Sequence, residues 1–225
     1  MANNGKTAIL TTMKTILCYG DSNTYGYIPA TGERYDHKTR WPMALERILN
    51  RNCADGTEWW VDEEGLNGRT SSFDDPVELE RNGLKHILPI LKSHKPLNIV
   101  AVMLGTNDLK RRFNPSPYDI SQGVLNVVKA IQYSETGPGN GAPKVLVICP
   151  PPLLDSSVFG DIFSGSAAIS KKLPPYYRDI CEESGAAFLD AGSVIKTSPV
   201  DGVHFEPNEH LRLAEAAAKI VRGME

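Results

Sequence analysis

Short apolar runs alternate with amphipathic segments along the chain, and this alternation constrains the fold more than any other feature. Runs this short, bounded by glycine, proline or polar turns, are typical of buried strands. We expect strands at residues 16–19, 59–62, 97–104, 144–149 and 186–189. Segments with apolar residues at helical spacing predict helices at residues 41–49, 84–91, 117–133, 167–184 and 208–222, the fourth interrupted at Pro174 and Pro175.

Strands that alternate with helices predict βαβ units and a parallel sheet that is covered on both faces. Right-handed crossovers then give a three-layer α/β/α sandwich, flavodoxin-like, with a five-stranded parallel sheet. No linker rich in proline, glycine or serine divides the 225 residues, and 41% hydrophobic residues suffice for one core. We expect residues 1–12 to be an N-terminal extension and residues 13–225 to form a single domain, since Met13 directly precedes the first strand.

The charge balance excludes some partners. With 24 basic and 27 acidic residues the net charge is -3, so the chain has no basic footprint for nucleic acid. The first twelve residues contain no apolar stretch long enough for a signal peptide or a membrane helix. These observations predict a cytoplasmic protein that acts on a small molecule and has no membrane partner. The four cysteines, at positions 18, 53, 149 and 181, lack metal-ligand spacing and are expected to be buried free thiols.

Polar residues follow the first strand at once, in the run Gly20-Asp21-Ser22-Asn23. Sites in open parallel sheets form outside the carboxyl ends of the strands, so a serine held there can point its hydroxyl into a pocket. Ser22 is therefore the candidate nucleophile. Taken alone, the same run is equally typical of a turn followed by a helix cap.

An acid and a histidine precede the last helix in the run Asp201-x-x-His204. One loop can place Asp201 against the imidazole of His204 and leave the other ring nitrogen for Ser22. A single histidine near a helix start is more often structural, but the acid partner favours a catalytic role. The other four histidines lack an equally placed acid, although Asp36 and His37 are adjacent.

Two further strand ends offer donors for an oxyanion. Gly105-Thr106-Asn107-Asp108 follows the third strand, so Asn107 lies beside Ser22 if the first and third strands are neighbours. Its amide can then donate to a developing oxyanion, a role worth roughly 3–4 kcal/mol. Gly68, after the second strand, lets a backbone N–H approach the same oxygen. Ordinary turns are the alternative interpretation of both segments.

Together the four segments resemble the SGNH hydrolases, or GDSL-type esterases and lipases, which carry Ser, Gly, Asn and His blocks in this order. The chain is most similar to the bacterial arylesterase and acyltransferase branch of that family. The resemblance implies a Ser22, His204 and Asp201 triad, with the backbone N–H groups of Ser22 and Gly68 and the amide of Asn107 as the oxyanion hole. It also implies a homo-oligomer that needs neither a cofactor nor a metal.

The resemblance places three residues at substrate-binding positions: Asn23, where the family carries leucine, and Tyr25 and Tyr27, where acyltransferase-like members carry tryptophan. We therefore expect a serine esterase that hydrolyses short-chain acetyl or aryl esters through an acyl-enzyme, with acyl transfer as a side activity. Loops at residues 24–40, 109–118 and 153–165 are expected to build the pocket walls.

Three alternatives remain open at this point. The enzyme can be a carbohydrate O-acetylesterase. Side chains of Asp21, Asp108, Asp201 and His204 can instead hold a divalent ion for phosphoester chemistry. From another class, a flavodoxin-like module can bind a nucleotide or flavin at its strand ends, although the chain lacks GxGxxG and P-loop motifs.

Overall fold

A five-stranded parallel sheet forms the centre of the protein in the computed structural model, which describes residues 12–51, 57–156 and 158–224. The strand order is β2-β1-β3-β4-β5, and every neighbouring pair is parallel. The strands are β1 (Thr12–Gly20), β2 (Thr57–Gly65), β3 (Ile99–Met103), β4 (Lys144–Cys149) and β5 (Ala187–Asp190). The expected number, order of appearance and direction of the strands are confirmed.

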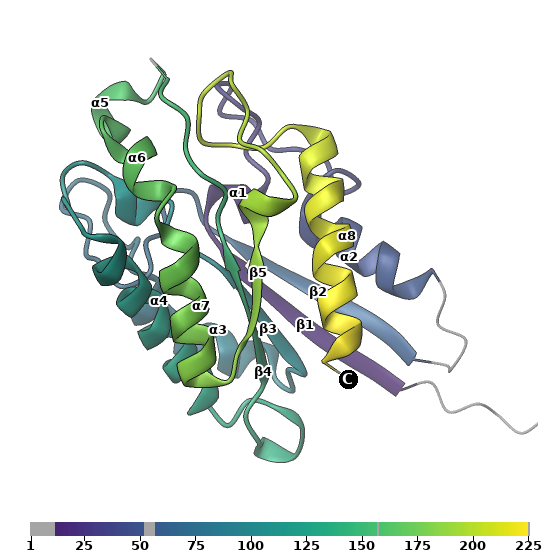
Figure 1. The fold of residues 1–225 in the computed structure, drawn as a ribbon. Coiled ribbons are helices and arrows are strands. Elements are labelled where there is room, and N and C mark those ends of the chain that lie inside the picture. The colour runs from purple at the N-terminus through teal and green to yellow at the C-terminus, as the bar shows by residue number, and fades with distance from the viewer. Residues whose placement is uncertain (1–11, 52–56, 157, 225) are drawn as a thin grey trace, which may run out of the picture.

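Helices cover both faces of this sheet and make the predicted three-layer sandwich (Figure 1). One face packs against α2 (Trp41–Asn50) and α8 (Pro207–Gly223). The other packs against α3 (Gly83–His94), α4 (Pro117–Gln132) and α7 (Leu173–Ser184). The amphipathic segments seen in the sequence are these five helices.

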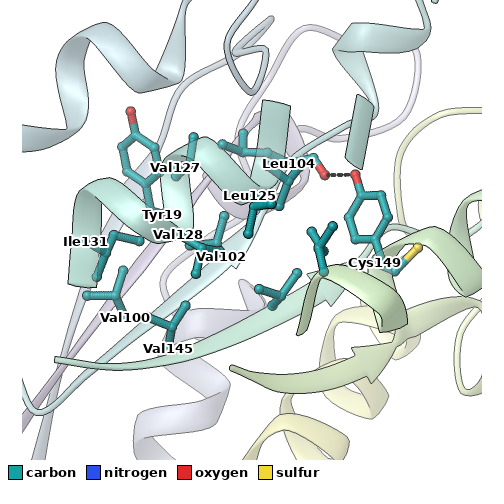
Figure 2. Packing of buried hydrophobic residues seen from close by; sticks show 14 of the residues in the cluster. Tyr19, Val100, Val102, Leu104, Leu125, Val127, Val128, Ile131, Val145 and Cys149 are labelled. Atoms are coloured by element: carbon teal, nitrogen blue, oxygen red, sulfur yellow. Dashed lines mark hydrogen bonds between the residues drawn. The ribbon is translucent and has the colours of Figure 1, made fainter. Parts of the chain in front are cut away.

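Strand β1 contributes to both hydrophobic cores. Leu17 and Tyr19 face the α3, α4 and α7 side, whereas Ile16 and Cys18 face the α2 and α8 side, and all four are fully buried. Figure 2 shows Tyr19 and strand residues such as Val102 packed against the inner face of α4. Apolar burial on both faces explains why this run reads as continuously hydrophobic. It also fixes the end of β1, where Gly20 begins the turn to Ser22.

The structure differs from the sequence prediction in the short elements. A one-turn helix, α1 (Ser22–Tyr25), begins the segment that was expected to be loop from residue 24 onward. The predicted helix at residues 167–184 is two helices, α6 (Ser166–Ser170) and α7, and both prolines lie in the first turn of α7. Proline is tolerated there because the first N–H groups of a helix have no intrahelical acceptor.

The described residues contain four more short helices: α5 (Gly160–Phe163), η1 (Asn107–Leu109), η2 (Pro138–Asn140) and η3 (Ala191–Ser193). Helix α5 lies inside the segment 153–165 that was expected to be a loop, because four residues are too few to show a helical period.

The described cysteines, Cys18, Cys149 and Cys181, are free and buried as expected. The prediction for Cys53 and that for residues 1–11 of the expected extension lie outside the described residues. Thr12, the last residue of the expected extension, already belongs to β1. None of the helices in the described part of the chain has the length and apolar character needed to cross a membrane.

Candidate active site

The carboxyl ends of three neighbouring strands bring the candidate residues together. Strand β1 lies between β2 and β3, so Ser22, Gly68 and Asn107 follow adjacent strands. Ser22 is the first residue of α1, and Asp21 caps this helix by accepting a hydrogen bond from the N–H of Asn23 at 2.9 Å. Both the cap and the nucleophile interpretation of this run are therefore compatible with the structure.

The loop before α8 places His204 against Ser22. The distance from Ser22 Oγ to His204 Nε2 is 2.9 Å, and the distance from His204 Nδ1 to Asp201 Oδ2 is 2.7 Å. An ionised carboxylate only accepts hydrogen bonds, so Nδ1 carries the ring proton and Nε2 accepts from the Ser22 hydroxyl. All three side chains are buried. The geometry is that of a nucleophile, a base and an orienting acid.

Asp201 is held by four donors. Its Oδ1 accepts from the N–H groups of Val203 and His204, each at 2.9 Å, and its Oδ2 accepts from Ala30 N–H at 3.0 Å as well as from the imidazole. Burial raises the pKa of Asp201, but the bonds from the His204 side chain and the backbone outweigh this effect and lower the pKa to about 2. The carboxylate is therefore ionised at neutral pH.

Aromatic side chains surround the imidazole. The ring of Tyr27 stacks on His204 with centroids 4.1 Å apart, and Phe159 meets it edge-on at 5.8 Å. The two rings restrict the imidazole to one orientation and cover it from solvent.

The donors expected for an oxyanion line the same cavity as Ser22. Asn107 Nδ2 donates to the Arg69 carbonyl at 3.1 Å, while Asp21 Oδ2 lies 3.5 Å away. Gly68 has φ of +81°, a left-handed conformation that glycine adopts at no steric cost. Arg69 holds the Gly65 to Thr70 turn against the ends of β1 and β2, because its guanidinium donates to the backbone carbonyls of Gly20 and Glu64.

A cavity of about 140 Å³ joins these groups. Its walls come from all three loops that were expected to build them, and also from the β2–α3 connection. The lining residues are Ser22, Tyr27, Asn67, Gly68, Glu78, Asn107, Lys110, Phe159, Ile162, Phe163, Val203 and His204.

The three substrate-binding positions inferred from resemblance differ in whether they line the cavity. Tyr27 lines the cavity, but Asn23 and Tyr25 are not among its described lining residues. Asn23 instead donates to the Val203 carbonyl at 3.2 Å, which ties α1 to the loop of His204. Tyr25 lies under the guanidinium of Arg34, 4.3 Å from the ring centroid. The described contacts of both residues are with protein, and their expected role in substrate binding stays a prediction.

Sequence reasoning missed several lining residues. Lys110 follows the Asn107 motif by three positions, a nearness that could have singled it out. Phe159 lies in the segment 153–165 that was expected to build a pocket wall, but the residue itself was not singled out. No local signal marks Glu78. Asn67 precedes Gly68 and was noted only as part of a turn.

The four side chains of the metal alternative each have another role. Asp21 caps α1, and Asp201 bonds His204, as described above. Asp108 accepts from the N–H of Ser71 at 3.0 Å and from its hydroxyl. Burial raises the pKa of Asp21 and of Asp108 to about 6. Within residues 12–51, 57–156 and 158–224, no three His, Cys, Asp or Glu side chains gather as a metal site.

Comparison with known families decides what this arrangement belongs to. A model of the GDSL-like lipase/acylhydrolase family matches residues 18–211. The chain belongs to this family. The resemblance to the SGNH hydrolases is thus confirmed, and the GDSL chain is a carboxylic ester hydrolase. Comparison with curated proteins finds no match.

Solved structures of this GDSL family superpose over nearly the whole chain. The native aryl esterase of M. smegmatis is 39% identical with a TM-score of 0.86, and covers 94% of this chain and 100% of its own. Est24, a carbohydrate acetylesterase from Sinorhizobium meliloti, is 36% identical with the same TM-score and the same coverage of both chains. Both similarities support esterase activity for this chain.

Proposed function

We propose that this GDSL hydrolase is a serine esterase that cleaves short-chain carboxylic esters through an acyl-enzyme, with Ser22 as nucleophile, His204 as base and Asp201 as its partner. One observation carries the proposal: Ser22 Oγ lies 2.9 Å from His204 Nε2, while the other ring nitrogen is bonded to an ionised carboxylate. A hydroxyl in this setting loses its proton to the imidazole as it attacks a carbonyl.

In acylation, Ser22 Oγ forms a bond to the ester carbonyl carbon, and its proton passes to His204 Nε2. The carbonyl π electrons move to oxygen, and the resulting oxyanion accepts from Ser22 N–H, Gly68 N–H and Asn107 Nδ2. Collapse breaks the bond to the alkoxy group, which leaves with the proton from His204. Water then attacks the acyl-enzyme with the same histidine as base, and the acid is released.

Asn107 suits the oxyanion role because its two amide hydrogens are held differently. One donates to the Arg69 carbonyl at 3.1 Å and fixes the side chain. The other faces Asp21 Oδ2 at 3.5 Å, a weak contact that an oxyanion can replace. Ser22 N–H begins a helix and Gly68 N–H sits in an open turn, so the three donors come from three different elements.

The size and lining of the cavity support the proposed substrate class. A volume of about 140 Å³ fits a small acyl group, and the aromatic wall of Tyr27 and Phe159 suits an aryl alcohol. The aryl esterase of M. smegmatis supports this choice. The acetylesterase of S. meliloti supports a second candidate, a carbohydrate O-acetylesterase, and the polar side chain of Asn67 at the cavity favours it. Acyl transfer to alcohols is proposed as a side activity of the same acyl-enzyme.

The experiment that tests the proposal is p-nitrophenol release from p-nitrophenyl acetate at pH 7.5 with chelator present. We expect Ser22→Ala to lose on the order of 10⁴- to 10⁶-fold in kcat. Ser193→Ala, an exposed serine outside the cavity, is the matched control and keeps full activity. Equal turnover by the wild type and Ser22→Ala would contradict the proposal. Rates on 1-naphthyl acetate and on acetylated xylose then separate the two substrate classes.

Self-association is a further proposal, which rests on the family resemblance. It is supported by Val77 and Leu79, two largely exposed apolar side chains on either side of Glu78. Light scattering at several protein concentrations tests it, and a monomer mass at all of them rejects it.

A further inference from the structure

One wall of the cavity carries an ion pair. Lys110, whose side chain is 3% exposed, donates from Nζ to Glu78 Oε1 at 2.8 Å and to Asp75 Oδ2 at 3.0 Å. Glu78 and Lys110 both line the cavity, whereas Asp75 lies behind them and is fully buried. A charged pair is an unusual wall for a pocket that receives an ester.

A second cation, Arg112, bonds the same two carboxylates. Arg112 bonds Asp75 Oδ2 at 2.6 Å and Glu78 Oε1 at 3.0 Å, so two cations and two carboxylates alternate. Burial raises the pKa of Asp75, but bonds from Arg112, Val77 N–H and Lys110 outweigh this effect and hold it well below its usual range. Arg81 also pairs with Glu78, with its Nε 3.8 Å from Glu78 Oε2, so three cations surround two carboxylates. Lys110, Arg112, Asp75 and Glu78 each have at least two partners in the cluster. The cluster is therefore rigid and does not swing aside easily.

The chemistry of the ester decides which substrate group meets this wall. The leaving oxygen must face His204 Nε2, which returns the proton to it, so the alcohol lies beside Tyr27 and Phe159. The carbonyl oxygen faces Gly68 and Asn107. The third substituent of the tetrahedral carbon, the acyl group, therefore points away from His204.

Glu78, Lys110 and Ile162 are among the cavity-lining residues that remain for the acyl group once Tyr27 and Phe159 are assigned to the alcohol and Gly68 and Asn107 to the carbonyl oxygen. A Cβ added at Gly68 would lie 2.4 Å from Glu78 Oε2, so the carboxylate lies against the turn that carries Gly68. Ile162 lies on the same side, because its carbonyl accepts from Arg111 N–H, next to Lys110, at 2.8 Å. Of the three hydrogens on Lys110 Nζ, two are bonded, and within the described residues the third has no acceptor.

We propose that the Glu78–Lys110 pair closes the acyl side of the cavity, limits the acyl group to about acetyl size, and favours a longer acyl group only if it carries an oxygen. This inference rests on the proposed function, since it assumes attack by Ser22. A longer alkyl chain would cover the charged pair without offering it a hydrogen bond, which is unfavourable. An acyl oxygen would instead accept the third hydrogen of Lys110.

The variant that tests this wall is Glu78→Leu with Lys110→Met, which removes one charge of each sign and leaves Asp75 paired with Arg112. The matched control is Glu183→Leu with Lys129→Met, an exposed ion pair of the same composition at 3.0 Å, between α7 and α4. The readout is kcat/KM for p-nitrophenyl acetate, butyrate and hexanoate, each divided by the hydroxide-catalysed rate. We expect the hexanoate-to-acetate ratio to rise about 10-fold or more in the cavity variant and to stay constant in the control.

A second measurement uses the wild type alone, in case the double variant does not fold. Pentanoate and 3-methoxypropanoate differ only by an ether oxygen in place of one methylene. We expect the wild type to prefer the methoxy ester at least about 5-fold after correction for intrinsic reactivity. A wild type that hydrolyses pentanoate equally well, or a folded double variant that keeps the wild-type chain-length profile, overturns the inference. Failure of Ser22→Ala to lose activity instead rejects the proposed function, so the two failures are distinct.

Discussion

The ring of Tyr27 stacks on the imidazole of His204, with centroids 4.1 Å apart and planes inclined by 26°. The imidazole becomes cationic each time it takes the proton of Ser22, and an aromatic face stabilises a nearby cation. The stack also keeps water from that face of the ring. Tyr27 is therefore a positioning residue for the base as well as a wall of the cavity.

Replacing Tyr27 tests this role. We expect Tyr27→Leu to lower kcat/KM for p-nitrophenyl acetate about 5-fold, which corresponds to loss of roughly 1 kcal/mol of cation–π stabilisation. Tyr27→Phe keeps the stack and is expected to stay within about 2-fold of the wild type. If the two variants lose activity equally, the hydroxyl matters and the stack does not.

Asn107 provides the test of the oxyanion hole. Asn107→Ala removes the amide donor, and kcat is expected to fall about 10²- to 10³-fold while KM changes little, because the oxyanion exists only in the transition state. Steady-state kinetics on p-nitrophenyl acetate measure both. Asn126→Ala, on the exposed side of α4, is the control. A KM effect without a kcat effect would assign Asn107 to substrate binding.

Asp201→Asn tests the orienting acid. Three backbone N–H groups point at the Asp201 carboxylate, and an amide NH₂ cannot accept from them and also from His204 Nδ1. The imidazole then loses the tautomer that accepts from Ser22, and kcat is expected to fall about 10⁴-fold. Asp190→Asn, the cap of η3, serves as the matched control. Activity within 10-fold of the wild type would show that His204 is oriented by other contacts.

Much of this arrangement follows from local sequence rules. Parallel strands that are buried on both faces must end at one edge, so Ser22 and Asn107 had to meet once β1 and β3 were neighbours. The spacing of Asp201 and His204 within one turn likewise limits how the two can pair. These inferences needed only the position of polar residues after apolar runs.

The polar wall could not be found in the same way. Glu78 reaches the cavity because Lys110 and Arg112 bind it across 32 and 34 residues of sequence, and such contacts leave no local pattern. Asn23 shows that a position next to a functional residue does not by itself determine what a side chain contacts. It follows the nucleophile directly, yet α1 turns its side chain toward the Val203 carbonyl, because a helix directs successive residues about 100° apart.

A buried histidine outside the site predicts how stability depends on pH. His210 is fully buried, and within the described residues neither ring nitrogen has a hydrogen-bond partner. Burial, with the nearby charges of His204 and Arg40, lowers its pKa to about 3. The unfolded chain, with a pKa near 6.5, binds the proton more readily, so this contribution to stability is full above pH 6.5 and is lost as the pH falls toward 3.

His210→Leu isolates that contribution. Asp21 and Asp108 titrate in the same range but are present in both proteins, so their effect cancels in the difference. The variant should gain stability relative to the wild type as the pH falls. We expect the difference in free energy of unfolding, variant minus wild type, to be about 2 kcal/mol larger at pH 5 than at pH 7. Urea denaturation at the two pH values measures it. An equal difference at both would mean that His210 does not titrate in this window.

The bond between Ser22 and His204 joins residues that are 182 positions apart, and the loop of His204 leads directly into α8, which packs on α2. Neither half of the chain therefore contains a competent site, and hydrolysis can begin only after the last helix has docked. Esterase activity during refolding is therefore expected to appear no earlier than the docking of α8. Esterase activity is therefore a direct assay for the completely folded chain.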